Sequence, residues 1–408
     1  MFSFIKKLDR NSRIILYTCF FAFTCNGMYT LTMGSALPDL KAAYGLSDTL
    51  SGLMLSAHSA GNMIAGFVSA LIPLYLGERR SITLLASLQA IGFVMMIISG
   101  NPVWLFIAYV FVGFGRGSVS NFDNRTVNRV SGGSPAAANL LHSSFAIGAI
   151  VAPMLFLVLR NTFGWRVAVG AVAFIGLIGV WRLSCMKLAY DRPDRKDKTN
   201  STLVFLKNPS FLIFAMMMFC YLCSEYAING WLVTYIQNKE ALLLSVGGAE
   251  GLRAYSQSMA TLLWFVMLLG RLFCAALSSK VSQKIMMLVA SIGVAIFFGL
   301  MLVSSTMTVV TICVAGLGFC LAGICPMIYS DAAVFTNTYP MATSIILAIG
   351  SSGAILMPTL VGALAERFGF TGGMSAIMVT IVLLMIFSLL NVVVKLRMTP
   401  EMKEKLNA

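Results

Sequence analysis

The hexapeptide GAIVAP occupies residues 148–153, and the similar GAILMP occupies residues 353–358, an offset of 205 residues. Two further pairs repeat at nearly the same spacing. GFG at 113–115 is matched by GLG at 316–318, and Gly66 is matched by Gly270. Three matches at nearly one offset are much harder to obtain by chance than one. The sequence therefore predicts a duplicated unit of about 200 residues.

The composition is typical of a membrane protein. The chain has 408 residues, of which 58% are hydrophobic and 11% charged, whereas soluble domains carry about a quarter charged residues. Its apolar runs are continuous and about 20 residues long, which is the length of a membrane-spanning helix. The strands of a β-barrel would alternate apolar and polar residues instead. We expect twelve helical spans, at residues 13–36, 48–76, 81–99, 103–130, 136–160, 164–185, 209–236, 254–279, 283–303, 307–332, 342–365 and 373–396.

Lys and Arg are distributed unevenly over the loops. With the N-terminus in the cytoplasm, twenty of them fall on the inner side and six on the outer side, as the preference of basic loops for the cytoplasm requires. The net charge of +14 is then mostly a signal that faces anionic lipid. We therefore expect the lipid bilayer, and no nucleic acid, as a partner. The sequence predicts a multi-pass protein of the cell (inner or plasma) membrane.

A polar loop divides the twelve spans into six and six. It reads DRPDRKDKTNSTLVFLKN and is the longest inner loop. We expect an N-terminal six-helix bundle at 1–190, a cytoplasmic linker at 191–208 and a C-terminal six-helix bundle at 209–408. The predicted fold is all-α, with twelve transmembrane helices in two pseudo-two-fold-related bundles and both termini cytoplasmic. This layout resembles the major facilitator superfamily, and the resemblance implies a cavity between the bundles that opens to each side in turn.

Two stretches resemble a narrower group, the fucose–galactose–glucose:proton symporter family and its bacterial relatives. The first is GFGRGSVSNFDNRTV followed by PAAANLLHSSFAIGAIVAP, and the second is SEYAINGWLVTY. The residues that match the family's patterns are Asn124, Val127, Asn139, Leu140, His142, Phe145, Gly148, Glu225, Gly230, Trp231 and Tyr235. The resemblance implies a sugar carrier that is driven by a cation gradient.

The chain departs from these patterns where the family couples to protons. Family members have acids on the first and fourth helices, at positions that fall near Gly34 and Ser120 here. The Asp that usually precedes the basic motif between helices 2 and 3 is also missing from SALIPLYLGERR. The family's proton pathway therefore cannot be transferred residue by residue.

Candidate cation-coupling residues are the ionisable groups that lie within predicted spans. Such groups are expensive inside a bilayer and usually face the protein interior. Asp123 and Glu225 are the acids placed well inside spans, and His58 falls near mid-membrane. We expect these three to bind the coupling cation. The alternative for each is a structural hydrogen bond within the packed helices.

Candidate solute-binding residues are amides and aromatic rings at membrane depth. Amides hydrogen-bond hydroxyl groups, and aromatic rings stack on the C–H faces of sugars. The alternatives are hydrogen bonds between helices and the aromatic belt at the membrane surface. The predicted solute site comprises Asn26, Asn62, Asn124, Asn139, Glu225, Asn229, Trp231 and Tyr235.

The fourth span ends in the polar stretch NFDNRTVNRV, residues 121–130. At 100° per residue, Arg116, Ser120, Asp123 and Val127 share one side of a helix, and we expect the polar arc to face the cavity. Arg116 and Arg271 are expected to form gating contacts or charge pairs.

The function that these residues favour is secondary active transport. We expect symport of a small polar solute, a sugar first of all, with H⁺ or Na⁺, by alternating access. One alternative is an organic-anion carrier that uses Arg116, Arg125 and Arg271, because guanidinium groups bind carboxylates. The other is drug or metabolite efflux by proton antiport, which the polarity of the fourth span disfavours. We expect no enzymatic activity, no cofactor, no metal site and a monomeric protein.

Overall fold

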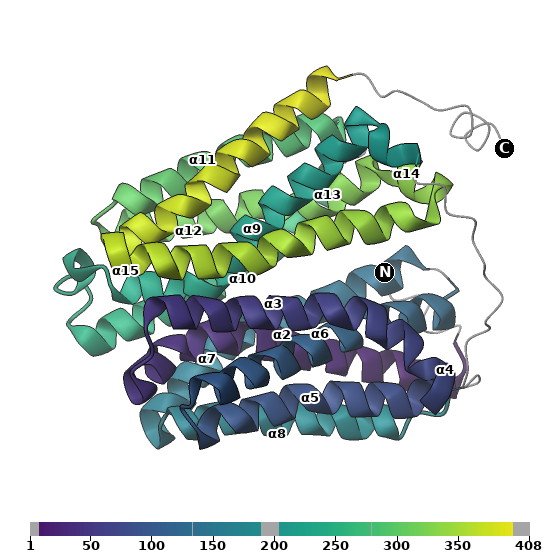
Figure 1. The fold of residues 1–408 in the computed structure, drawn as a ribbon, viewed down its shortest axis with the longest axis horizontal. Coiled ribbons are helices and arrows are strands. Elements are labelled where there is room, and N and C mark those ends of the chain that lie inside the picture. Colours follow the sequence, from purple (N-terminus) through teal and green to yellow (C-terminus); the bar gives the residue numbers. More distant parts are fainter. Residues whose placement is uncertain (1–7, 133, 189–203, 279, 395–408) are drawn as a thin grey trace.

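The computed structural model describes residues 8–132, 134–188, 204–278 and 280–394 and is almost entirely helical. Two tiers of helices run in the same general direction (Figure 1). The lower tier in that view contains α2 to α8, and the upper tier contains α9 to α15. These are the two predicted six-helix bundles. The predicted linker lies outside the described residues up to position 203.

The bounds of the helices follow the predicted spans closely. The N-terminal bundle consists of α2 (Arg10–Tyr44), α3 (Asp48–Leu71), α4 (Pro73–Leu76), α5 (Glu78–Ile98), α6 (Pro102–Val130), α7 (Pro135–Phe163) and α8 (Trp165–Ser184). The C-terminal bundle consists of α9 (Pro209–Gln237), α10 (Ala249–Leu277), α11 (Gln283–Val303), α12 (Met307–Leu321), α13 (Ile324–Asp331), α14 (Ala333–Thr338) and α15 (Pro340–Val393). Two short 3₁₀ helices, Val204–Lys207 and Glu240–Leu242, complete the described chain.

Ten helices in the described part of the chain are long and apolar enough to cross a membrane. The last of them, in α15, consists of two helices that are joined at Gly369, where the backbone has φ 73° and ψ 170°. The 24-residue α3 adds another long helix. With α15 counted as two helices and α3 added, the total agrees with the twelve predicted spans. The all-α membrane fold is confirmed.

Two predicted spans are interrupted. The span at 48–76 ends as α3 and continues as the short α4, which starts at Pro73 because proline has no N–H to donate. The span at 307–332 is broken between α12 and α13, where Gly323 precedes the second piece. This break lies in the glycine-rich stretch 316–323, where glycine lowers the cost of leaving the helix.

Glycines at equivalent positions hold equivalent helix pairs together. A Cβ on Gly148 of α7 would overlap with the carbonyl of Thr24 on α2. In the other bundle, a Cβ on Gly353 of α15 would lie 2.7 Å from the Phe219 carbonyl oxygen on α9. The repeated GAIVAP and GAILMP therefore mark the same contact, between the first and fifth helices of each bundle. Small residues allow such close approach, and packing is what joins helices in a membrane.

We predict that Gly148→Ala and Gly353→Ala each destabilise the protein by about 1–3 kcal/mol, because the added methyl group meets backbone atoms that cannot move aside. Thermal unfolding of the purified protein in detergent measures the effect. Gly170→Ala on α8 is the matched control, because its new Cβ has no atom within 4 Å. Equal melting temperatures for the three variants and the parent would contradict this account.

Candidate functional site

A cavity lies between the two bundles, with a volume of about 120 Å³. Helices α2, α3 and α6 of the N-terminal bundle line one side, and α9, α10 and α15 of the C-terminal bundle line the other. Its walls are Thr30, Met33, Gly34, Leu55, His58, Ser59, Arg116, Leu222, Glu225, Tyr226, Asn229, Gly230, Trp264 and Pro358. Drug-sized ligands occupy roughly 300–1,000 Å³, so the cavity in this conformation suits a small solute.

Arg116 is the cation of the cavity wall, and it connects the two bundles. Its Nε donates to Thr30 Oγ1 on α2 (3.0 Å), and its Nη1 donates to the Tyr226 hydroxyl on α9 (2.5 Å). The guanidinium also lies over the rings of Phe145 and Tyr226, with its Cζ 5.8 and 5.4 Å from their centroids. The arginine is therefore held in place by contacts from both bundles.

Glu225 brings a carboxylate to the same cavity from α9. The Tyr221 side chain lies close to it on the same helix, and the positive charges that act on it are those of Arg271 and Arg116. The anion of one bundle thus faces the cavity-lining cation of the other. Any event that neutralises Glu225 weakens an attraction that crosses the interface.

Asn229 and His58 add polar groups on opposite walls. Asn229 Oδ1 accepts a hydrogen bond from Trp264 Nε1 (3.0 Å), which leaves the amide nitrogen of Asn229 as a donor. His58 is 6% exposed, and its Nε2 has no hydrogen-bond partner among the described residues. The cavity therefore offers both donors and acceptors to a polar solute.

Four predicted residues meet in this cavity: His58, Arg116, Glu225 and Asn229. Trp231 and Tyr235 lie in the packed core instead, at 0% and 1% exposure. The Trp231 indole donates to the Pro358 carbonyl (3.1 Å), and the Tyr235 hydroxyl donates to the carbonyls at the end of α11. Both aromatic side chains therefore join helices within the C-terminal bundle.

The other predicted amides lie outside the cavity wall. Asn26 is fully buried, donates to the Arg116 carbonyl (3.2 Å) and accepts from Gln89 Nε2 (2.9 Å), so it joins three helices. Asn124 donates to the Ser120 carbonyl of its own helix (2.8 Å). Asn62 packs against Gly117, and Asn139 is exposed near the start of α7.

Asp123 and Arg271 also differ from Glu225 in their surroundings. Asp123 is 0% exposed, and neither of its carboxyl oxygens has an N–H or O–H partner among the described residues. The thiol of Cys19 on α2 is its polar neighbour, so its side chain lies inside the N-terminal bundle rather than on the cavity. Arg271 follows Trp264 by two turns of α10, and its guanidinium lies over the Trp264 ring, with Cζ 5.8 Å from the ring centroid.

Sequence reasoning missed Thr30, Tyr226 and Trp264. Tyr226 directly follows Glu225, and Trp264 occupies the middle of an apolar span, which hides it among many aromatic core residues. Thr30 has no sequence signal of its own, because hydroxyl groups often bond within their own helix, as this one does to the Asn26 carbonyl (2.8 Å).

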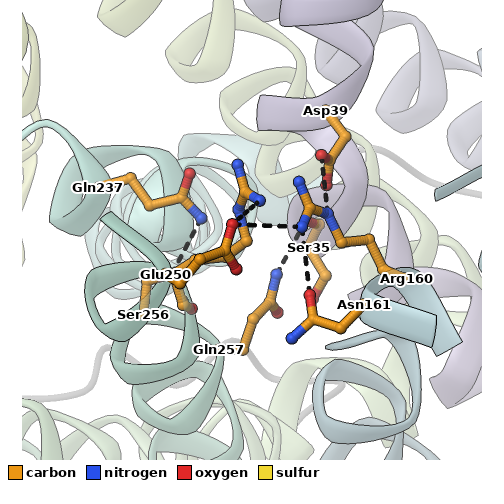
Figure 2. Close-up of polar contacts among 9 residues, drawn as sticks. Ser35, Asp39, Arg160, Asn161, Gln237, Glu250, Ser256 and Gln257 are labelled. Carbon is orange, nitrogen blue, oxygen red and sulfur yellow. Dashed lines mark hydrogen bonds and ion pairs between the residues drawn. The ribbon is translucent and has the colours of Figure 1, made fainter. Parts of the chain in front are cut away.

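The outer side of the cavity is closed by polar contacts between the bundles. Figure 2 shows Arg160 of α7 between Asp39 of α2 (3.2 Å) and Glu250 of α10 (3.7 Å). Arg253 pairs with the same glutamate within α10 (3.0 Å), and Gln257 donates to the Ser35 carbonyl (3.0 Å; Figure 2). Asp39, Arg160 and Glu250 are called the outer charge cluster below.

Backbone contacts reinforce the closure. Between α3 and α15, Thr359 donates to Ser56 Oγ through its N–H (3.2 Å), and the two hydroxyls are 2.7 Å apart. A Cβ on Gly34 would overlap with the Asn229 carbonyl of the opposite bundle. These contacts between the bundles, like the one between Arg116 and Tyr226, lie at the cavity or on its outer side. The structure is thus closed toward the outside.

We predict that Arg160→Gln opens the outer side more often, because it removes the charge that joins α7 to Glu250 on α10. The Glu250 side chain is 70% exposed, and an ion pair of this kind contributes about 0–1 kcal/mol, so the open population should rise roughly two- to fivefold. The readout is labelling of a Met33→Cys variant, with Cys185 replaced, by a membrane-impermeant thiol reagent added outside.

Arg253→Gln is the matched control for this experiment. The Arg253→Gln variant also removes a positive charge next to Glu250. Arg253 and Glu250 lie on the same helix, however, so the variant should be labelled at the same rate as the parent. Equal acceleration by both variants would show that the outer charge cluster does not hold the bundles together.

Comparison with known proteins agrees with the fold. A family model described as Major Facilitator Superfamily matches residues 19–334, well over half of the chain. "Membrane protein MosC" of Rhizobium meliloti is 23% identical over 355 residues, which cover 86% of this chain and 83% of that protein.

Two solved structures share the architecture. A mutant form of the nucleoside transporter NupG has a TM-score of 0.75 at 13% identity, over 94% of this chain and 100% of its own. A bacterial homologue of the human lysosomal transporter Spinster, inward-facing and occupied, has a TM-score of 0.71 at 14% identity, over 96% of this chain and 99% of its own. At such identities the likeness concerns the fold. Since the family model spans most of both bundles, this multi-pass membrane protein belongs to the Major Facilitator Superfamily, a family of small-molecule transporters rather than enzymes.

Proposed function

We propose that the protein carries a small polar solute, most simply a sugar, across the membrane together with H⁺ or Na⁺. The observation that supports this most is Glu225, a carboxylate on the wall of a cavity between the bundles. An acid inside a membrane span is costly and usually functional. A cation that binds at Glu225 would remove that cost.

Coupling follows from the position of Glu225 relative to Arg116. With Glu225 ionised, its attraction to Arg116 favours bundles that are close together around the cavity. A bound H⁺ or Na⁺ reduces this attraction, and the solute replaces it with its own hydrogen bonds to both walls. Binding of the cation at Glu225 together with the solute in the cavity would therefore change the balance between the outward-open and inward-open arrangements of the bundles. Coupled transport requires such a change.

The moving parts in this proposal are the two bundles, residues 1–190 and 209–408, with 191–208 as the cytoplasmic connection. Within the outer charge cluster, the Arg160–Glu250 pair connects the two bundles and would break when the cavity opens outward, whereas the Arg160–Asp39 pair lies within the N-terminal bundle and would stay. Because the Glu250 side chain is 70% exposed, breaking its pair with Arg160 costs little.

A hydroxyl-rich solute suits the cavity wall. Thr30, Ser59, Asn229 and Tyr226 supply hydroxyl and amide groups, and the Trp264 ring can stack on an apolar ring face. One structural neighbour is a nucleoside transporter, and nucleosides are also hydroxyl-rich. The first screen should therefore measure thermal stabilisation by hexoses, nucleosides and carboxylic acids, with and without Na⁺.

We predict that Glu225→Gln abolishes accumulation of the stabilising solute against its gradient but leaves exchange of internal for external solute. The amide keeps the shape of the side chain, but it takes up no proton and offers Na⁺ no negative charge. Reconstituted vesicles with an imposed pH or Na⁺ gradient, loaded with radiolabelled solute for the exchange arm, provide the measurement.

Glu240→Gln is the control, because Glu240 is an exposed acid beyond the end of α9. The Glu240→Gln variant should accumulate solute like the parent. Normal accumulation by Glu225→Gln would refute coupling at this residue.

A second candidate function is transport of an organic anion, and the specific observation in its favour is Arg116 on the cavity wall. A guanidinium binds carboxylates through two parallel hydrogen bonds. Its donors already hold Thr30 and Tyr226, so an anion would have to replace at least one of these contacts.

Arg116→Gln distinguishes the two candidates. For an anion carrier we predict loss of carboxylate binding by at least about tenfold, because a charge-assisted hydrogen bond contributes roughly 1.5–3 kcal/mol. For a carrier of neutral solutes, binding of the sugar or nucleoside should weaken less than this. Isothermal titration of the solute that passes the first screen gives the answer, with Arg367→Gln, an exposed arginine outside the cavity, as the control.

A further inference from the structure

A second groove lies at the cytoplasmic end of the N-terminal bundle, far from the central cavity. It is formed by the first turns of α5 and the last turn of α8, and its volume is about 460 Å³. Its walls are Arg79, Arg80, Thr83, Leu84, Ser87 and Ser184. The first two belong to the basic GERR motif, which the transport mechanism does not use.

The charge in this groove is unpaired among the described residues. Arg79 and Arg80 are exposed, and neither forms an ion pair with a described acid. The neighbouring Glu78 is 5% exposed and lies 3.8 Å from Arg125 on α6 instead. Two guanidinium groups therefore remain free to bind an anion at the membrane surface.

The hydroxyl groups beside the arginines are oriented as acceptors. Thr83 donates to the Arg79 carbonyl (2.8 Å), Ser87 to the Leu84 carbonyl and Ser184 to the Trp181 carbonyl (both 2.7 Å). Their hydrogens are thus used within their own helices, and their oxygens can accept from a ligand. A phosphoglycerol headgroup matches both features, because its phosphate accepts from arginine and its hydroxyls donate.

Apolar side chains continue from the groove toward the middle of the membrane. Leu84 on α5 is 52% exposed, and Trp181 on α8, one turn before Ser184, is 65% exposed. Further along the same helices, Ile91 and Phe174 are exposed as well. Such a surface suits acyl chains, so a ligand with a phosphate head and a hydrocarbon tail fits the whole surface better than a soluble phosphate.

The opposite end of α5 provides a comparison within the same protein. A groove of about 490 Å³ lies there, at the outer end, lined by Ile98, Ser99, Asn101, Val103, Trp104 and Ile107. It is similar in volume and has no charged residue. The cationic character therefore belongs to the cytoplasmic groove, which faces the leaflet that attracts basic residues.

We propose that the groove of Arg79, Arg80 and Ser184 binds the headgroup of an anionic phospholipid, phosphatidylglycerol, in the cytoplasmic leaflet. The bound lipid bridges α5 and α8 and anchors the cytoplasmic end of the N-terminal bundle. This site is separate from the solute cavity, so it stands or falls independently of the transported solute.

The test is native mass spectrometry of the purified protein with added phosphatidylglycerol or phosphatidylcholine. The parent protein should retain phosphatidylglycerol in preference to phosphatidylcholine. The double variant Arg79→Gln/Arg80→Gln should bind phosphatidylglycerol about 25-fold more weakly, since each basic residue near the surface contributes roughly a factor of five. Arg10→Gln/Arg13→Gln removes the same charge from the same face, at exposed positions of α2, and should bind like the parent.

Ser184→Leu provides a second test that leaves the charge unchanged. The leucine side chain fills the groove and should therefore also weaken phosphatidylglycerol binding. This variant tests the proposal even if Arg79→Gln/Arg80→Gln fails to fold. Equal loss in both arginine double variants, equal retention of the two lipids, or undiminished binding by Ser184→Leu would each overturn the proposal. If soluble glycerol phosphate displaced bound phosphatidylglycerol as effectively as added phosphatidylglycerol does, the site would recognise the headgroup without a role for the lipid tail. That result would also overturn the proposal.

Discussion

Both bundles depend on helices that approach so closely that only glycine leaves enough room. Lipid tails are as apolar as leucine, so helices in a bilayer gain little from hydrophobic burial and are joined by packing and hydrogen bonds. Gly148 against α2 and Gly353 against α9 provide this contact in each bundle. The same two contacts fix α2 and α9, which carry Thr30 and Glu225. The feature that repeats in the sequence therefore also sets the positions of cavity residues.

Polar contacts join the bundles at the cavity and on its outer side, and in the proposed transport cycle these contacts would have to break. Arg116 reaches across the cavity to Tyr226, and the outer charge cluster joins α7 to α10. In the proposed transport cycle the motion would occur at this interface, where the solute would bind.

The order and number of helices could be predicted from apolar runs, because a membrane span needs a minimum length of apolar chain. The breaks at Pro73 and near Gly323 were not predicted, since proline and glycine in a membrane helix can either bend it or end it. Within the site, His58, Arg116, Glu225 and Asn229 stood out because polar groups in a span face the interior. Trp231 did not reach the cavity for a simple geometric reason. It follows Asn229 by two residues and so points about 200° away from it around the helix.

The sequence by itself determined the membrane class, the duplicated six-helix unit and the orientation by basic loops, because these follow from apolar length, repetition and charge. Only the tertiary structure decided which polar residues share one cavity. Asp123 and Glu225 look alike in the sequence, but one is enclosed within the N-terminal bundle and the other faces its partner bundle. The reason is that the rotation of a helix is set by its neighbours. A polar residue is free to face any interior surface, and the packing of the other helices selects which one.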